Sequence, residues 1–156
     1  QNHLMPIKII AIGKKNVSWV EACVSEYQKR LRPPFACSWE LLPHSHLDDE
    51  NARHEESQRI LARIKSDDIV VLLDERGKQL SSPELSQYLS AKLDASAAVV
   101  IIIGGAYGVD QTVFSRANLV WSLSKLVFPH QLVRVILIEQ LYRAQQIRIG
   151  SPYHHE

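Results

Sequence analysis

Short runs of apolar, often β-branched residues alternate along this chain with segments whose apolar residues recur at helical spacing. The predicted strands cover residues 6–12, 35–42, 69–73, 98–103 and 119–123. Helices are predicted from Ser18 to before Pro33, around Ile60, Leu61 and Ile64, from Ser82 to about Leu93, just after Asp110, and from Pro129 to about Ile149. This alternation predicts an α/β fold with a mainly parallel sheet flanked by helices, whose ligand site lies at the carboxyl ends of the strands.

Local signals add detail to these elements. Ser18 followed by Glu21 is typical of a capping box, and Trp19, Val20, Cys23, Val24, Tyr27 and Leu31 form one helical face. Ser82 and Pro83 fit the N-cap and first position of a helix. The polar stretch 43–56 (PHSHLDDENARHEE) is predicted to be a mobile connection, and residues 74–82 (DERGKQLSS) are predicted to be a turn.

The length of 156 residues predicts a single domain that buries its core without metal or disulfide support. Cys23 and Cys37 each fall on an apolar stripe, which predicts two core thiols in a reducing cytoplasm. No apolar stretch approaches the roughly 20 residues that cross a bilayer, and no signal peptide is visible. The domain is expected to cover residues 5–156, with residues 1–4 before Met5 as an artificial extension.

The predicted strand 98–103 stops at Gly104 and Gly105, and Gly108 follows three residues later. This GGxxG pattern is not the dinucleotide fingerprint GxGxxG, because Lys125 and Leu126 stand about twenty positions on, where an acidic residue is required. It also lacks the Lys-Ser or Lys-Thr of a phosphate loop. A tight strand-to-helix turn and a ligand-binding turn both remain open, and the position at the carboxyl end of a buried strand favours the ligand.

No metal site is predicted. Residues 54–58 (HEESQ) begin like the zinc signature HExxH but end in glutamine, so one ligand is missing and a solvated helix face is the preferred interpretation. His44 and His46 lie in the polar stretch without further ligands nearby. No Ser-His-Asp or Cys-His arrangement for nucleophilic catalysis is evident either.

The segment 129–149 is apolar nearly all the way round the predicted helix. Val133, Ile136, Leu137, Leu141, Ala144 and Ile147 form one stripe, whereas Val135, Ile138 and Tyr142 lie off it. Since a small domain covers one face of a terminal helix, the other face is predicted to meet a second subunit. Cationic and titratable groups also gather near this end of the chain, including Arg134, Arg143 and the histidines of the tail.

Four segments together resemble the RlmH family, which comprises SPOUT-class methyltransferases acting on a pseudouridine of the large-subunit (23S) ribosomal RNA. These segments are LDERGKQLSS (73–82), IIIGGAYGVD (101–110), SLSKLVFPHQLVRVILIEQLYRA (122–144) and SPYHHE (151–156). The resemblance extends from Ile7 to His155, and the combination of GGxxG, FPH and the terminal PYH is specific.

The resemblance implies a trefoil knot, in which the C-terminal segment threads through a loop, and a homodimer built through the C-terminal helix and the knot. It also implies that the cofactor S-adenosylmethionine binds largely to backbone groups and apolar side chains. The implied cofactor-binding residues are Leu73, Gly104, Gly105, Gly108, Leu123, Ser124, Lys125, Leu126, Val127 and Phe128. Side chains at Gly104 or Gly105 are expected to collide with the ligand or with the knot crossing.

N3 of the pseudouridine is the implied methyl acceptor. Because the donor is already activated, the protein must mainly align the reacting atoms and favour loss of the N3 proton. Cationic groups stabilise the developing anion, and a neutral histidine accepts the proton. The candidate catalytic residues are His130, Arg134, Tyr153, His154 and His155, with the tail reaching the partner subunit's cofactor pocket. Family members usually carry arginine or lysine where this chain has His155.

The net charge of +1 is too small for strong binding of naked RNA, so the assembled ribosome is the expected substrate. Two alternatives remain: a non-catalytic ribosome-binding or assembly module of the same fold, and a SPOUT enzyme that acts on transfer RNA. The RNA that accepts a labelled methyl group distinguishes the three. No membrane partner is expected.

Overall fold

The computed structural model describes residues 5–155, so the expected extension at residues 1–4 and the final Glu156 lie outside the described residues. Five strands are present: β1 (Ile7–Ile12), β2 (Cys37–Leu42), β3 (Ile69–Gln79), β4 (Val99–Ile103) and β5 (Leu119–Ser122). They alternate with the helices α1 (Ser18–Gln28), α2 (Asp49–Leu61), α3 (Ser82–Asp94), α4 (Gln111–Arg116) and α5 (His130–Arg148). This order confirms the predicted α/β alternation.

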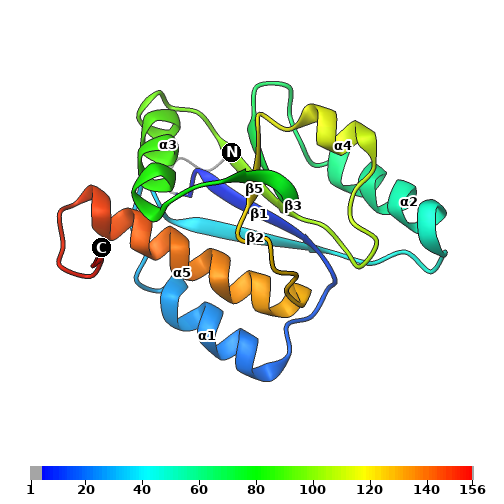
Figure 1. The fold of residues 1–156 in the computed structure, drawn as a ribbon, viewed down its shortest axis with the longest axis horizontal. Helices are drawn as coiled ribbons and strands as arrows, with labels where there is room; N and C mark the ends of the chain where they lie inside the picture. Colours follow the sequence, from blue (N-terminus) through cyan, green and yellow to red (C-terminus); the bar gives the residue numbers. More distant parts are fainter. Residues whose placement is uncertain (1–4, 156) are drawn as a thin grey trace.

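All five strands join one parallel sheet in the order β2-β1-β4-β3-β5. Its two faces follow the alternation of side chains along each strand. Ile101 and Ile103 of β4 pack with α1, α3 and α5, whereas Val100 and Ile102 pack with α2 and α4. The result is three layers, helices on either side of a central sheet (Figure 1).

The register of the sheet brings the strand ends together. Leu73 of β3 pairs with Ile103 of β4, which also pairs with Ala11 of β1, and Leu73 pairs with Trp121 of β5 on its other side. These four residues therefore form one row across the sheet, near its carboxyl edge. The segments that follow them in sequence leave the sheet at the same edge, where the sequence placed the ligand site.

The prediction that residues 74–82 form a turn is wrong, because β3 continues to Gln79. Leu73 and Lys78 both pair with Trp121, so the register shifts and residues 74–77 bulge out of the β3–β5 ladder. The backbone at Gly77 lies so close to β5 that an added Cβ would be 2.5 Å from the carbonyl carbon of Val120. A contact between two strands maintains the extended backbone here, and local turn signals do not reveal it.

Several helix starts also differ from the predictions. Val17 is the N-cap of α1 and no side chain caps this helix; Glu21 instead accepts a hydrogen bond from Asn16. The capping box of α3 begins at Ser81 with Glu84, one residue before the predicted cap. The polar stretch 43–56 is helical from Asp49, so most of it is not a mobile connection.

Some predicted stripe members are less buried than expected. Trp19 is 53% exposed on α1 and Cys23 is only half-buried. Cys37 is buried in the core as expected, and burial raises the pKa of its thiol to about 12.

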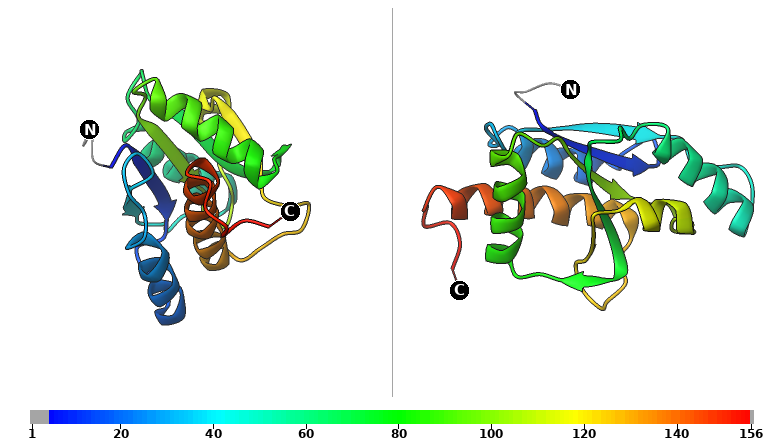
Figure 2. Two further views of the ribbon diagram at one scale, coloured as in Figure 1. Left: turned by 90° about the vertical axis from the view of Figure 1, so that its left-hand side faces the viewer. Right: turned by 90° about the horizontal axis from the view of Figure 1, so that it is seen from above.

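The apolar surface of α5 is largely covered within this chain. The helix packs beside both α1 and α3, so Ile138, which lies off the predicted stripe, is fully buried in the core (Figure 2). The argument for a dimer from the apolar circumference of this helix is therefore weaker than the sequence suggested.

Among the described helices, none combines the length and the hydropathy required to span a membrane.

Candidate active site

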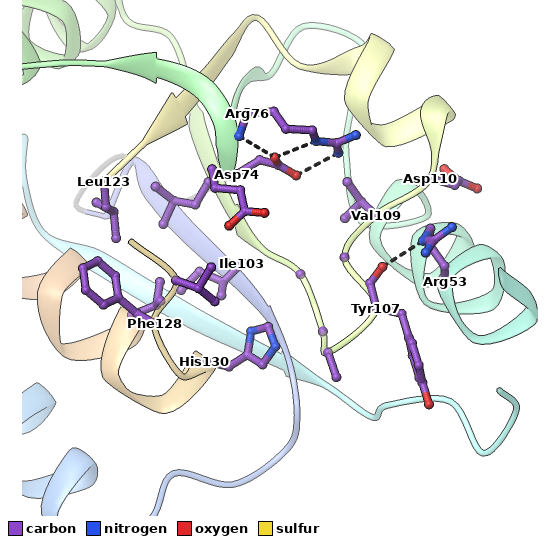
Figure 3. A pocket seen from close by; sticks show the side chains of 18 of the residues that line it. Arg53, Asp74, Arg76, Ile103, Tyr107, Val109, Asp110, Leu123, Phe128 and His130 are labelled. Carbon is purple, nitrogen blue, oxygen red and sulfur yellow. Dashed lines mark hydrogen bonds and ion pairs between the residues drawn. The ribbon is translucent and has the colours of Figure 1, made fainter. Parts of the chain in front are cut away.

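A cavity of about 900 Å³ opens at the carboxyl edge of the sheet. It is bounded by the end of β3 and its bulge, the turn after β4, the segment after β5, the first turns of α5 and part of α2 (Figure 3). Its volume lies within the range of sites for small molecules and cofactors. The position matches the site predicted from the strand and helix order.

One wall of the cavity is apolar and another is polar. Side chains from strand ends, from the segment after β5 and from α5 form the apolar wall: Leu73, Ile103, Trp121, Leu123, Phe128 and Val133. Figure 3 shows Leu123, Ile103 and Phe128 close together, with Arg53, Tyr107 and Asp110 at the opposite side. Such a cavity suits a ligand with an apolar ring at one end and charged groups at the other.

Asp74 and Arg76 form an ion pair in the β3 bulge at the cavity. Arg76 Nε and one carboxylate oxygen of Asp74 are 2.9 Å apart, and the guanidinium lies 4.6 Å from the ring centre of Phe114. The hydrogen bond from Arg76 holds the pKa of Asp74 below its ordinary value. Asp74 is therefore anionic at neutral pH and complements cationic groups of a ligand.

The turn between β4 and α4 carries the three predicted glycines. Gly108 N donates to the Gly105 carbonyl at 3.0 Å, and Gly108 has a φ of +74°, a conformation that favours glycine. Gly104 is also tightly packed, since an added Cβ would be 3.2 Å from Cγ1 of Val109. The turn thus exposes backbone rather than side chains along this part of the cavity.

Helix α2 holds this turn from outside. Arg53 Nε donates to the Tyr107 carbonyl at 2.8 Å, and the backbone N–H of Asp110 donates to the Ser57 hydroxyl at 2.9 Å. Burial opposes ionisation of Asp110, but hydrogen bonds from Thr112, Val113 and His54 outweigh it and lower its pKa. The interpretation of HEESQ as a solvated helix face is confirmed for His54 and Gln58, which are exposed, and is wrong for Glu56 and Ser57, which are buried.

Nine of the ten residues implied to contact the cofactor line this cavity. They are Leu73, Gly104, Gly105, Gly108, Leu123, Ser124, Leu126, Val127 and Phe128. Lys125 is absent from the lining, while its neighbours are held by a hydrogen bond from Leu126 N to the Ser124 hydroxyl at 3.0 Å. The resemblance thus selected residues that the fold brings together from three separate segments.

Of the five candidate catalytic residues, only His130 lines the cavity. His130 remains accessible to solvent, but partial desolvation by its neighbours, followed by the charge of Arg134, lowers its pKa, whereas the charge of Glu56 opposes this shift. The imidazole is consequently neutral at pH 7, the form that accepts a proton.

Arg134 is buried and directed away from the cavity lining. Its guanidinium donates to the carbonyls of Ile12 at 3.1 Å and Gly13 at 2.8 Å, and to the Asn16 side chain at 2.6 Å. These bonds tie the first turns of α5 to the end of β1.

The tail packs on the distal half of α5, outside the cavity of its own chain. Tyr153 donates to a Glu139 carboxylate oxygen at 2.9 Å, and its ring meets Tyr142 edge-to-face at 4.8 Å between centroids. His154 lies 3.2 Å from Arg143, and neither His154 nor His155 is part of the lining. Burial and the bond to Glu139 raise the pKa of Tyr153, so its hydroxyl is a donor at neutral pH.

Two segments that line the cavity contain no residue other than Leu73 that the sequence had assigned to the site: the bulge, with Asp74, Glu75 and Arg76, and α2, with Glu50, Asn51, Arg53 and His54. The sequence does contain a signal for the bulge, because the charged residues of DERGK (74–78) directly follow a buried strand. A signal for the helix was the spacing of Ala52, Glu56 and Ile60, which share one buried face.

Comparison with known proteins decides the family. Residues 5–154 match the family described as "Predicted SPOUT methyltransferase". The chain belongs to the SPOUT methyltransferase family. Two relatives named ribosomal RNA large subunit methyltransferase H support this: one from Christiangramia forsetii is 38% identical, with 97% of this chain and 99% of the relative covered. One from Thioalkalivibrio sulfidiphilus is 41% identical, with 97% and 100% covered.

Solved structures show the same SPOUT-type fold at low sequence identity. A probable methylase family protein from Haemophilus influenzae Rd KW20 matches with a TM-score of 0.56 and 12% identity, covering 97% of this chain and 71% of the other. A methylase family protein from Neisseria gonorrhoeae matches with a TM-score of 0.51 and 12% identity, covering 100% and 88%.

Within residues 5–155, no group of three or more His, Cys, Asp and Glu side chains could hold a metal ion.

Proposed function

We propose that this SPOUT methyltransferase transfers a methyl group from S-adenosylmethionine to N3 of a pseudouridine in the 23S RNA of the large ribosomal subunit. The observation that carries the proposal is the cavity at the carboxyl edge, which both the glycine turn and the segment after β5 line. The two relatives named as ribosomal RNA large subunit methyltransferases support the choice of RNA.

The residues of the cavity fit this donor. The apolar wall around Leu123 and Phe128 suits the adenine ring, and backbone groups of the glycine turn supply donors and acceptors for its nitrogens. Asp74, kept anionic by Arg76, complements a cationic sulfonium or amino group. When bound, the donor supplies an electrophilic methyl group.

His130 is the best-placed proton acceptor of this chain. It lines the cavity and is neutral at pH 7, so its imidazole takes the proton from N3 of the target base. Loss of that proton makes the nitrogen a nucleophile. His130 also begins α5, whose backbone N–H groups at the N-terminus favour a developing anion.

A homodimer places the tail residues at a cavity. Tyr153 donates a hydrogen bond to Glu139. At about 1.5 Å per helical residue, Glu139 lies about 14 Å from His130 along the axis of α5. The tail is therefore remote from the cavity of its own chain and is proposed to complete the cavity of a second copy. Leu126 and Val127, which are 71% and 79% exposed, provide apolar surface for such a contact.

The ribosome is the proposed substrate and the cytoplasm the expected location. A chain with a net charge of +1 gains little from phosphate neutralisation alone, so recognition relies on shape and local contacts.

The decisive test combines calorimetric titration with S-adenosylmethionine and transfer of a labelled methyl group to ribosomes lacking the modification. Saturable donor binding, with label in one nucleotide of 23S RNA, is expected. A protein that binds the donor and labels only transfer RNA would contradict the substrate. A protein that binds ribosomes and not the donor would support the non-catalytic alternative.

A further inference from the structure

Helix α2 carries a buried carboxylate group of which only one oxygen has a hydrogen-bond partner within residues 5–155. Glu56 is 3% exposed, and its Oε2 accepts a hydrogen bond from the backbone N–H of Ser45 at 2.8 Å. Within residues 5–155, its Oε1 has no hydrogen-bond partner. An unpaired, buried carboxylate oxygen is costly for stability, so its position calls for a physical reason.

The unpaired oxygen faces the glycine turn. A Cβ added to Gly105 would be 2.6 Å from Glu56 Oε1 and 3.0 Å from Cγ2 of Ile12. Gly105 lines the donor cavity, whereas Glu56 is absent from the lining and lies behind the turn. What approaches this glycine most closely is therefore a side chain of the same protein.

Glu56 also connects two segments. Through Oε2 it holds Ser45 in the segment after β2, and through Oε1 it abuts the turn after β4. Arg53 and Ser57 bond to the same turn on either side of this contact. One face of α2 thus contacts the turn through three side chains, those of Arg53, Glu56 and Ser57.

We propose that Glu56 is a positioning residue that fixes the glycine turn in the form that binds the methyl donor; this role rests on the proposed function. Its carboxylate fills the space behind Gly105, and glycine is required at 105 because of it. Donor affinity then depends on a residue that never touches the donor.

The test is a double-mutant cycle with Gly105→Ala and Glu56→Ala, read by donor Kd in calorimetry and by Tm. Each single change is expected to weaken donor binding by about tenfold or more. The double variant is expected to bind better than Gly105→Ala alone, because the shorter side chain at 56 makes room for the new methyl group. Glu56→Gln keeps the shape and the acceptor for Ser45, so its Kd is expected to stay within about threefold of wild type.

Asp68→Asn is the matched control, since Asp68 is a buried carboxylate that accepts from Lys65 N at 2.8 Å, at the start of β3. It is expected to lower Tm without changing donor Kd. Unchanged Kd in Glu56→Ala, additive losses in the double variant, or a Glu56→Gln variant as weak as Glu56→Ala would each overturn this role. If the wild-type protein binds no donor, the proposed function and the role of Glu56 are both refuted.

A second cavity carries a separate inference. It has a volume of about 410 Å³ and lies after the carboxyl ends of β1 and β2, lined by Gly13, Lys14, Lys15, Pro43, His44 and His46. The rings of His44 and His46 meet at 5.9 Å between centroids. Lys14 and Lys15 are exposed, and neither ammonium group forms an ion pair with another residue in the range 5–155.

We infer that this second cavity binds an unpaired nucleotide of the RNA substrate, next to the donor cavity; the inference rests on the proposed function. Imidazole rings offer faces on which a base stacks, and the two free ammonium groups match its phosphates. Since β1 and β4 are adjacent strands, a nucleotide here lies beside the end of β4, where the donor cavity begins.

The test replaces both lysines (Lys14→Ala with Lys15→Ala) and, separately, both histidines by alanine. Each pair is expected to raise the ribosome KM about tenfold, leave donor Kd unchanged and, for the lysines, flatten the salt dependence of ribosome binding. Lys29→Ala with Lys92→Ala, at the end of α1 and on α3, removes the same charge elsewhere; this control is expected to keep the wild-type KM.

An unchanged KM in both pairs, or an equal rise in the control, would overturn the nucleotide site. Co-sedimentation with ribosomes separates this failure from failure of the proposed function. If the wild-type protein transfers no methyl group but its binding to ribosomes depends on Lys14 and Lys15, the proposed reaction is refuted and the nucleotide site is supported. Binding of free nucleotide with unaltered ribosome affinity would also refute it.

Discussion

At the scale of single residues, two buried charged side chains were not understood from sequence. The sequence predicts Glu56 on a solvated helix face, and it makes Arg134 a catalytic candidate because a cationic group stabilises the developing anion. In the structure both side chains contact backbone segments near the cavity. Glu56 lies behind the glycine turn, and Arg134 donates hydrogen bonds to carbonyl groups at the end of β1. The two side chains contact backbone segments next to the cavity, and neither lines it.

Arg134→Met is predicted to destabilise the fold. Methionine retains much of the volume but leaves the carbonyls of Ile12 and Gly13 without their donor, so the free energy of unfolding should fall by about 3 kcal/mol. Thermal unfolding should show a Tm lower by about 6–12 °C. A variant with wild-type Tm and strongly reduced kcat would instead place Arg134 in catalysis.

The pH dependence of methyl transfer is predicted to follow His130. Partial desolvation and the charge of Arg134 lower its pKa below the ordinary value of about 6.5. A lowered pKa keeps the base neutral as the pH falls, so the midpoint of the loss of activity on acidification should lie below the pKa of an ordinary imidazole. An NMR titration of the His130 ring with the same midpoint as the activity profile would assign the profile to this residue. Loss of activity already above pH 7 on acidification would exclude His130 as the base.

At the scale of secondary-structure elements, the bulge in β3 decides what reaches the cavity. The shift that pairs both Leu73 and Lys78 with Trp121 pushes residues 74–77 out of the ladder, and Asp74 and Arg76 thereby line the cavity. The bulge closes at Gly77, where the backbones of β3 and β5 come into contact. Strand pairing and the polar wall therefore depend on one glycine.

Gly77→Ala is predicted to be strongly destabilising. The new Cβ would lie 2.5 Å from backbone atoms of Val120, which cannot move as a flexible side chain can, so a loss of about 2 kcal/mol or more is expected. Gly150→Ala is a useful comparison, because Gly150 has open space around it and a φ of +74°, and about 1 kcal/mol of backbone strain is expected there. Chemical denaturation of both variants measures the difference, and equal losses would contradict the close approach at Gly77.

At the scale of the whole molecule, the tail follows the end of α5, far from its first turns (Figures 1 and 2), and it is these first turns that line the cavity. Tyr153, His154 and His155 can therefore take part in methyl transfer only at the cavity of another copy. The proposed dimer therefore rests on the proposed role of the tail and not on the apolar circumference of α5, which α1 and α3 largely cover within the chain.

Mixing two inactive variants is predicted to restore activity. Gly104→Val fills space in the donor cavity, and a chain with His154→Ala and His155→Ala lacks the tail groups. If the tail acts across the dimer, a mixed dimer contains one intact site, and random exchange should recover about a quarter of wild-type activity. Sites formed within single chains would recover none, and a monomeric mass in solution would contradict the arrangement altogether.

Local sequence patterns were enough to predict the alternation of strands and helices, the parallel sheet and the turn at Gly104, Gly105 and Gly108. These follow from short-range patterns, since apolar spacing and glycine at the end of a buried strand act within a few residues. The resemblance added the segment 123–128, and the knot that it implies remains a prediction.

Contacts between residues that are far apart along the chain could be identified only in the folded structure. The oxygen of Glu56 behind Gly105, the turn of Arg134 away from the cavity and the extension of β3 to Gln79 each depend on a partner far along the chain. Helical spacing shows which face of α2 is buried, but not what lies against it. Such contacts are fixed by the packing of layers on the sheet, which no local pattern specifies.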